Sequence, residues 1–193
     1  MVTAAEVIGS YVDALDLLSG SSTHLDVGCG LGLLTSRLME TLRFSRVFGY
    51  DIDLGRINSA SRFHVSPGLV FTSSPDVFQL GNYSSATACF VFHELDDPEV
   101  IFSRVYRSLV DGGLFGVLDY DMVGCSKTDF LERFVRRAEK EEIKLLGEDE
   151  CYRLHTSRGL DDCCKVGRQV GFDRVSVDRF QGKYFSWIGR KSL

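Results

Sequence analysis

The sequence lacks any run of about 18 to 20 apolar residues, the length that a helix needs to cross a bilayer, and its first residues show no basic stretch followed by an apolar core. We therefore expect a cytoplasmic protein with no membrane-spanning segment. Its six cysteines include no C-x-x-C pair, and the adjacent Cys163 and Cys164 are poorly spaced for a metal site. We expect buried, reduced thiols and no bound metal.

Positive charge is also scarce, with 22 Lys and Arg against 27 Asp and Glu and a net charge of −5. Nucleic acid is therefore a poor candidate partner, because neutralising phosphates needs a basic surface. The 193 residues, 44% of them hydrophobic, suffice for one core and are too few for two domains of ordinary size. We expect a single domain over residues 1–193, and the oligomeric state stays open.

Three glycines at alternate positions, Gly28, Gly30 and Gly32, follow a short β-type run, and a helical period begins at Leu34. Glycines at such a turn permit positive φ and let a ligand approach the main chain, while the next helix directs its first N–H groups at that ligand. A dinucleotide loop needs its third glycine at position 33, where Leu33 stands. The pattern therefore predicts a site for a nucleotide-like ligand that is not a dinucleotide.

An acidic residue follows the second β-type run, which covers residues 46–50 and ends in Asp51-Ile52-Asp53. In a right-handed βαβ unit this end lies beside the glycine loop, where a carboxylate can accept both hydroxyls of a ribose. We predict that Asp51 does so. Asp53 suits the N-cap of the next helix better.

Further strands are expected near residues 69–72, at 86–92 as a nearly continuous apolar run, and up to Tyr120. Between the last two, Asp97 and Pro98 predict a helix start, and this helix is expected to bury Ile101, Val105 and Leu109 and to end at residues 111–113.

Helices are predicted near the N-terminus and after the fifth strand, and an antiparallel hairpin is predicted near the C-terminus. Residues 3–18 have a helical period, and residues 121–158 read as two inserted helices, with Ser126 and Asp129 resembling a capping box. A last helix from Leu160 is expected to end at Gly171, before an antiparallel hairpin over residues 175–188.

The pattern Asp26-x-Gly28-x-Gly30-x-Gly32 resembles the first motif of class I S-adenosylmethionine-dependent methyltransferases, D/E-x-G-x-G-x-G. Residues 92–98 and 107–113 resemble the fourth and fifth motif region, although Asp111 stands where relatives carry Pro. The resemblance implies an α/β, Rossmann-like doubly wound sheet of seven strands, mostly parallel with an antiparallel C-terminal hairpin and helices on both faces. It implies S-adenosylmethionine as the cofactor.

In such enzymes the glycine loop holds the amino-acid and ribose parts of the cofactor. After the third strand, relatives usually hold the adenine with an acidic pair; here Ser74 or Asp76 is available, and the sequence does not choose between them. Tyr11 of the N-terminal helix is a candidate for the methionine end, unless that helix only packs on the sheet. The cofactor-binding candidates are Asp26, Gly28, Cys29, Gly30, Gly32, Asp51, Ile52, Ser74 and Phe90.

The function that we predict is methyl transfer to a small-molecule acceptor. His93, at the end of the fourth strand, is the best-placed catalytic base if the acceptor carries a proton, and His155 is a second candidate. A role in the cofactor's surroundings or at the helix entry is the alternative for His93. Residues 121–158 form either a substrate lid or solvated helices. Three other functions stay open: a protein methyltransferase, an NAD(P)-binding oxidoreductase and a binding domain without turnover.

Overall fold

The computed structural model describes residues 23–42, 44–134, 137–180 and 182–193. The expected helix over residues 3–18, with Tyr11, lies outside the described residues. Among the residues that are described, no helix combines the length and the apolarity that crossing a membrane requires. All six cysteines are free; Cys29, Cys151 and Cys163 are buried as expected, whereas the other three are only half-buried.

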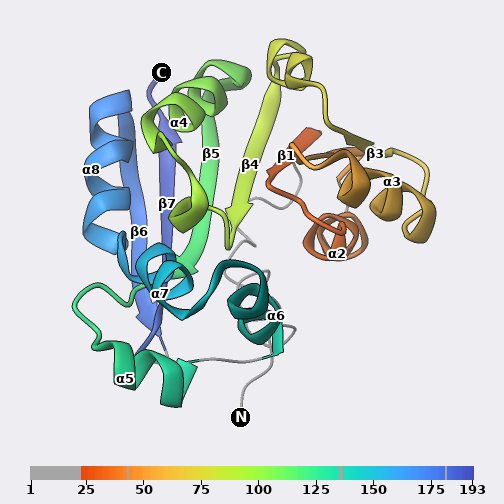
Figure 1. Cartoon of the computed structure of the whole chain (residues 1–193). Coiled ribbons are helices and arrows are strands. Elements are labelled where there is room, and N and C mark those ends of the chain that lie inside the picture. Colours follow the sequence, from red (N-terminus) through yellow and green to blue (C-terminus); the bar gives the residue numbers. More distant parts are fainter. Residues whose placement is uncertain (1–22, 43, 135–136, 181) are drawn as a thin grey trace.

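A seven-stranded sheet in the order β3-β2-β1-β4-β5-β7-β6 organises the chain (Figure 1). The first five strands run parallel, and β7 is antiparallel to both of its neighbours. This confirms the expected mostly parallel sheet with an antiparallel C-terminal hairpin. The strands are β1 (Thr23–Val27), β2 (Arg46–Tyr50), β3 (Leu69–Thr72), β4 (Tyr83–Cys89), β5 (Leu109–Tyr120), β6 (Phe172–Phe180) and β7 (Tyr184–Lys191).

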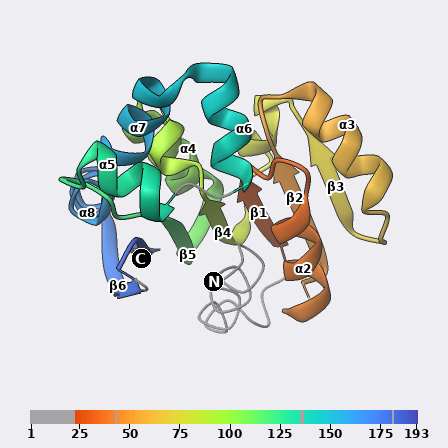
Figure 2. The ribbon, with the colours of Figure 1, turned by 60° about the horizontal axis from the view of Figure 1, so that its bottom comes forward.

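Period-two alternation along β5 divides the core between the two faces of the sheet. Phe115 and Val117 point to the face that α4 (Pro98–Ser108) and α8 (Leu160–Val170) cover, whereas Leu114 and Leu118 point to the face that α2 (Leu33–Thr41) covers. Figure 2 shows α2 and α3 (Leu54–Phe63) beside the β1–β3 half of the sheet. Each large side chain buried in these layers contributes about 1.5–3 kcal/mol.

The last helix approaches the sheet closely because Trp187 lies beneath a glycine. A Cβ added to Gly167 of α8 would come within 2.4 Å of the indole of Trp187. As expected, α8 ends at Gly171, which has φ +109°.

Two predicted boundaries are wrong. The fourth strand ends at Cys89 instead of residue 92, because Phe90 takes φ +55° and residues Phe92–Glu94 form a 3-10 turn, η3. The apolar run predicted a longer strand because Phe92 is buried in the core, although it does not belong to the strand.

The helix predicted to reach residues 111–113 ends at Ser108, and β5 begins at Leu109. The cause is an irregular pairing between β4 and β5, in which Tyr83 pairs with Leu109 while Ser85 pairs with Leu114. The start of this helix is confirmed, since the Asp97 carboxylate accepts the N–H groups of residues 99 and 100.

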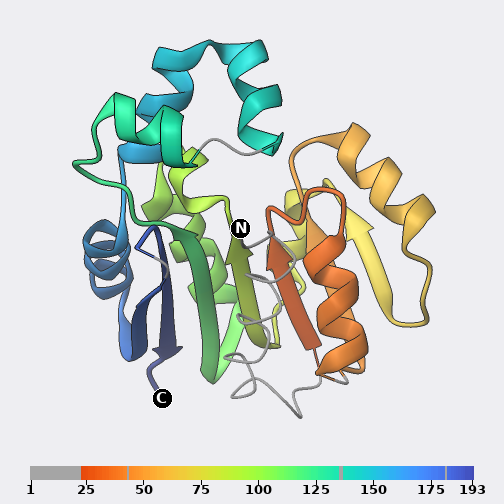
Figure 3. The same cartoon turned by 90° about the horizontal axis from the view of Figure 1, so that it is seen from below.

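The described residues between β5 and α8 form three helical segments, instead of the expected two. They are α5 (Lys127–Asp129) with its π-helical continuation η4 (Phe130–Phe134), α6 (Arg137–Leu146) and α7 (Glu148–Thr156). Ser126 caps the first as predicted, and its hydroxyl accepts the N–H of Asp129 at 3.1 Å. Gly147, at φ +84°, separates α6 from α7 within one charged run. Figure 3 shows α6 and α7 beyond the arrowheads of β1 and β4, the carboxyl edge of the parallel strands.

A buried line of polar side chains joins β1, β4 and α2 beneath the glycine loop. Asp26 accepts the hydroxyl protons of Thr35 and Thr87 at 2.7 and 2.8 Å, while the His24 ring lies 2.9 Å from the Thr87 hydroxyl and 2.8 Å from that of Ser85. Thr87 donates its one proton to Asp26, so it must accept from His24 Nε2, and Nδ1 then accepts from Ser85. Burial raises the pKa of Asp26 to about 6 and lowers the pKa of His24 to about 3.

These two shifts predict opposite effects of pH on stability. The folded chain binds an extra proton at Asp26 between about pH 4 and 6, so acidification through this window stabilises the wild type relative to Asp26→Asn by about 3 kcal/mol. For His24 the unfolded chain binds the extra proton, so acidification below about pH 6.5 should destabilise the wild type relative to His24→Gln. Urea unfolding of the three proteins at a series of pH values measures both differences. Differences that do not change with pH would contradict the assignment.

Candidate active site

The glycine loop leaves β1 and is fixed to the end of β2 by its main chain. Gly28, Gly30 and Gly32 have φ values of +70°, +53° and +80°, which cost other residues about 1–2 kcal/mol. The N–H groups of Gly28 and Cys29 both donate to the carbonyl of Tyr50, at 2.7 and 3.0 Å. The loop therefore has a defined shape before any ligand binds.

Two of these glycines face different surroundings. A Cβ on Gly28 would lie 2.5 Å from Cγ2 of Val91, so the glycine lets the chain after β4 close on the loop. A Cβ on Gly30 would meet no atom of the described residues within 4 Å. Gly30 thus exposes its main chain to space that a ligand can enter.

Asp51 connects the glycine loop to the end of β2, and it lies beside the loop as predicted. Its Oδ2 accepts the Gly30 N–H at 2.8 Å, and its Oδ1 accepts the N–H of Asp53 at 2.9 Å. Each carboxylate oxygen keeps a second lone pair. Asp53 caps α3 as expected, accepting the N–H groups of Gly55 and Arg56 at 2.8 and 3.1 Å.

A cleft of about 330 Å³ opens between the end of β2 and the chain that follows β4. A second hollow, of about 220 Å³, lies against the glycine loop and shares Gly28, Arg56 and Phe90 with the first. Ile52 lines the cleft with 85% of its surface exposed, which leaves a large apolar side chain open to a ligand. The first cleft is lined by Val27, Gly28, Tyr50, Asp51, Ile52, Asp53, Arg56, Phe90, Val91, Glu94, Leu95 and Ile101, and the second includes Asp26, Cys29 and Gly30.

Phe90 combines a strained backbone with a position between the two hollows. Its φ of +55° is uncommon for a residue with a side chain, and such strain gathers at functional sites. Its ring packs 5.2 Å from that of Tyr120 and 5.7 Å from that of Tyr184. By contrast, neither Ser74 nor Asp76 is among the described residues that line these hollows, and the Ser74 hydroxyl caps the 3-10 turn η2 (Pro75–Gln79).

His93 lies behind the cleft wall instead of in it. Its side chain is 2% exposed, with Nδ1 2.6 Å from Oδ1 of Asp119 and Nε2 3.7 Å from Oε1 of Glu94. Burial lowers the pKa of His93, but the charge and hydrogen bond of Asp119 outweigh it, so the pKa is raised. Glu94 is the member of the group that lines the cleft, and burial raises its pKa.

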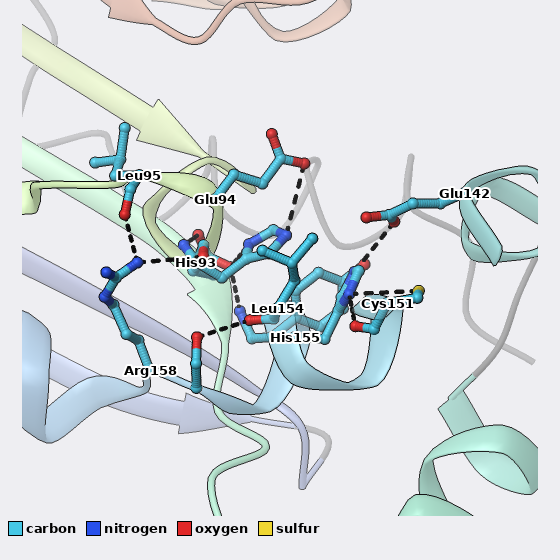
Figure 4. Close-up of polar contacts among 11 residues, drawn as sticks. His93, Glu94, Leu95, Glu142, Cys151, Leu154, His155 and Arg158 are labelled. Atoms are coloured by element: carbon cyan, nitrogen blue, oxygen red, sulfur yellow. Dashed lines mark hydrogen bonds and ion pairs between the residues drawn. The ribbon is translucent and has the colours of Figure 1, made fainter. Parts of the chain in front are cut away.

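The segment between β5 and α8 holds this group from outside (Figure 4). The ring of His155, on α7, lies 4.7 Å from that of His93, and its Nδ1 is 2.9 Å from the carbonyl of Cys151. Arg158 donates to the carbonyls of His93, Leu95 and residue 96. The chain after β4 is thus fixed to the inserted helices at several points.

Part of the chain is similar in sequence to known methyltransferases. Residues 25–115 match a family described as a methyltransferase domain. The malonyl-[acyl-carrier protein] O-methyltransferase of Hahella chejuensis is 33% identical over 94 residues, which cover 46% of this chain and 33% of that protein. The chain thus matches about a third of the length of this curated relative.

The matched part of the chain, which includes the glycine loop, is thus similar to a methyltransferase domain. Solved structures share the fold. An S-adenosylmethionine-dependent methyltransferase from Aquifex aeolicus superposes with a TM-score of 0.71 at 15% identity, covering 95% of this chain and 89% of that one. The N-methyltransferase NodS of Bradyrhizobium japonicum gives a TM-score of 0.67 at 14% identity, covering 95% and 94%.

The methyltransferase family uses S-adenosylmethionine, and the cleft has the chemistry to hold it. The open main chain at Gly30, the spare lone pairs of Asp51 and the exposed Ile52 lie along continuous hollows. The sequence alone did not single out Arg56 or Asp119, and it noted Glu94 only as a neighbour of His93. Their positions in the sequence could have indicated these two acidic residues. Glu94 follows β4 and Asp119 lies at the end of β5, so both are at the carboxyl edge of the parallel strands, where ligands bind in open α/β sheets.

Replacement of Asp51 should weaken cofactor binding. Asp51→Ala removes the acceptor for the Gly30 N–H and the lone pairs open to a ribose, so S-adenosylhomocysteine should bind about ten- to a hundredfold more weakly, with Asp51→Asn between. The matched control is Asp53→Ala, which should lose about 1 kcal/mol of stability through its helix cap and keep its affinity. Calorimetric titration and urea unfolding separate the two effects. The reverse pattern would move the ribose contact to Asp53.

Proposed function

We propose that this chain transfers the methyl group of S-adenosylmethionine to a small-molecule acceptor. The observation that carries the proposal is the convergence of the glycine loop, Asp51 and Ile52 on one cleft whose far wall is the chain after β4. The family match favours this function over the oxidoreductase alternative. The cytoplasmic location stays an expectation from the sequence.

On the cofactor side, the main chain of the loop at Gly28, Gly30 and Gly32 would hold the amino-acid and ribose parts. Asp51 would accept the ribose hydroxyls, and Ile52 would pack on the adenine. The cofactor supplies a methyl group on a positively charged sulfur, which is the reactive chemistry of the site.

Other candidates would act less directly. Asp26 and Cys29 would support the loop from beneath, and the Phe90 ring would border the sulfur. Ser74 is the weakest of these candidates, because it is not among the described residues that line the two hollows.

On the acceptor side, Glu94 is better placed than His93 to touch a bound molecule. Glu94 lines the cleft, while His93 is buried behind it with Asp119 at 2.6 Å. Where the accepting atom carries a proton, Glu94 would take it and His93 would act as a positioning residue. This modifies the prediction that His93 itself is the base.

A small acyl compound is the first acceptor class to test. The relative from Hahella chejuensis carries malonyl-[acyl-carrier protein] in its name, which supports an acyl acceptor. The inserted helices over the carboxyl edge would limit access and favour a small acceptor over a protein, which remains the alternative.

Glu94→Gln should lower kcat by about a hundredfold or more for an acceptor that must lose a proton, while S-adenosylhomocysteine affinity changes less than about threefold. Glu99→Gln, exposed on α4, is the matched control and should keep full activity. The assay follows labelled methyl transfer to short acyl thioesters and dicarboxylic acids, with a protein extract in parallel. Label found in protein alone would refute the small-molecule proposal, and an unchanged kcat would refute the role of Glu94.

Arg158→Ala should release the chain after β4 from the inserted helices. We expect a rise of about tenfold in the KM of the acceptor with little change in cofactor affinity, because Arg158 contacts the carbonyls of residues 93, 95 and 96 and not the glycine loop. Arg153→Ala, an exposed arginine of α7 paired with Glu150, is the control. Equal losses of cofactor and acceptor affinity would show that the segment belongs to the cofactor site.

A further inference from the structure

Three side chains with different donor atoms meet between α6 and α7, apart from the cleft lining (Figure 4). Cys151 and His155 are one turn apart on α7 and so share one of its sides, and Glu142 reaches them from α6. Their sulfur, nitrogen and oxygen atoms all lie within 4.8 Å of one another, and Cys151 and His155 are buried.

The orientation of His155 suits a ligand role. Its Nδ1 lies 2.9 Å from the carbonyl of Cys151, and a carbonyl can only accept, so the proton stands on Nδ1. The lone pair of the neutral ring is then on Nε2, which points at Oε2 of Glu142 at 3.6 Å. Histidines that bind metals commonly donate their other N–H to a carbonyl in this way.

The spacing of two of the three ligand atoms also suits an ion between them, whereas the Cys151 sulfur lies 3.8 Å from Nδ1 of His155 and would turn toward Nε2 on binding. Zinc binds nitrogen and oxygen at about 2.0–2.2 Å in tetrahedral geometry, which separates two such ligands by about 3.4 Å. The 3.6 Å between Nε2 of His155 and Oε2 of Glu142 needs little adjustment to reach this value.

We propose that Glu142, Cys151 and His155 form a binding site for a zinc-class divalent transition metal. A thiolate and an imidazole favour such a metal over magnesium or calcium, and a water molecule would take the fourth position. On binding, the Cys151 thiol loses its proton to solvent and its sulfur bonds to the ion, while His155 and Glu142 donate lone pairs; no electron is transferred. The ion would join α6 to α7 beside His93, whose ring packs on His155.

The test uses the full chain, first freed of metal with a chelator. Zinc titration with elemental analysis should give one ion per chain, and cobalt(II) should give the absorption bands of tetrahedral, thiolate-bound cobalt. Glu142→Gln, His155→Gln and Cys151→Ser should each weaken binding about tenfold or more. The matched controls Glu148→Gln, His64→Gln and Cys164→Ser, at positions outside the cluster, should bind as the unaltered chain does.

The rival interpretation is an ion pair between protonated His155 and Glu142, without a metal. Failure of the unaltered chain to bind one ion, cobalt spectra without a thiolate band, or undiminished binding by Glu142→Gln would each overturn the proposal. Should Cys151→Ser fail to fold because the residue is fully buried, Glu142→Gln still decides, since that side chain is 25% exposed.

Discussion

The attachment of the glycine loop to the end of β2 is the constraint on which the site depends. The carbonyl of Tyr50 accepts two loop N–H groups, and the Asp51 carboxylate accepts a third from Gly30. A hydrogen bond to a charged group contributes about 1.5–3 kcal/mol, so this attachment offsets part of the entropy lost in ordering a glycine-rich turn. One carboxylate thus shapes the loop and remains able to accept from a ligand, because its two oxygens have more lone pairs than the main chain uses.

The buried polar line beneath the loop fixes the same region from the other side. His24 pairs with Ser85 and Asp26 with Thr87 in the register of β1 and β4, so the hydrogen bonds run between directly paired residues. A one-residue slip would turn these groups to the opposite, apolar face. The network therefore specifies register, and Thr35 carries it to α2. Burying these polar groups costs free energy, because burial disfavours their charged forms. It therefore lowers the pKa of His24 and raises the pKa of Asp26.

Much of this arrangement could be predicted from local sequence. The glycine loop, the position of Asp51 and the caps at Asp53 and Asp97 each depend on a few neighbouring residues, and the structure has them as expected. The C-terminal hairpin was also predictable, because its strands alternate around a short turn.

The errors have a common cause, since each depends on contacts distant in sequence. No local pattern shows that Phe90 takes positive φ, or that β4 and β5 pair irregularly after Leu109. The burial of His93 is set by Asp119, 26 residues later, and by α7. The group formed by Glu142, Cys151 and His155 could not be predicted from the sequence either, because its members lie on two different helices.

The short chain between β4 and α4 connects these parts. Phe90, Val91 and Glu94 line the cleft, whereas Phe92 and His93 are buried between them. Because cleft-lining and buried residues alternate within five positions, a shift of the buried side chains would also shift the residues that line the cleft. Arg158, in the loop after α7, contacts the carbonyls of this short chain, and Val91 lies against Gly28 of the glycine loop. A displacement of α7 would therefore move Glu94 and Val91 together, so the inserted helices help to set the geometry of the cleft.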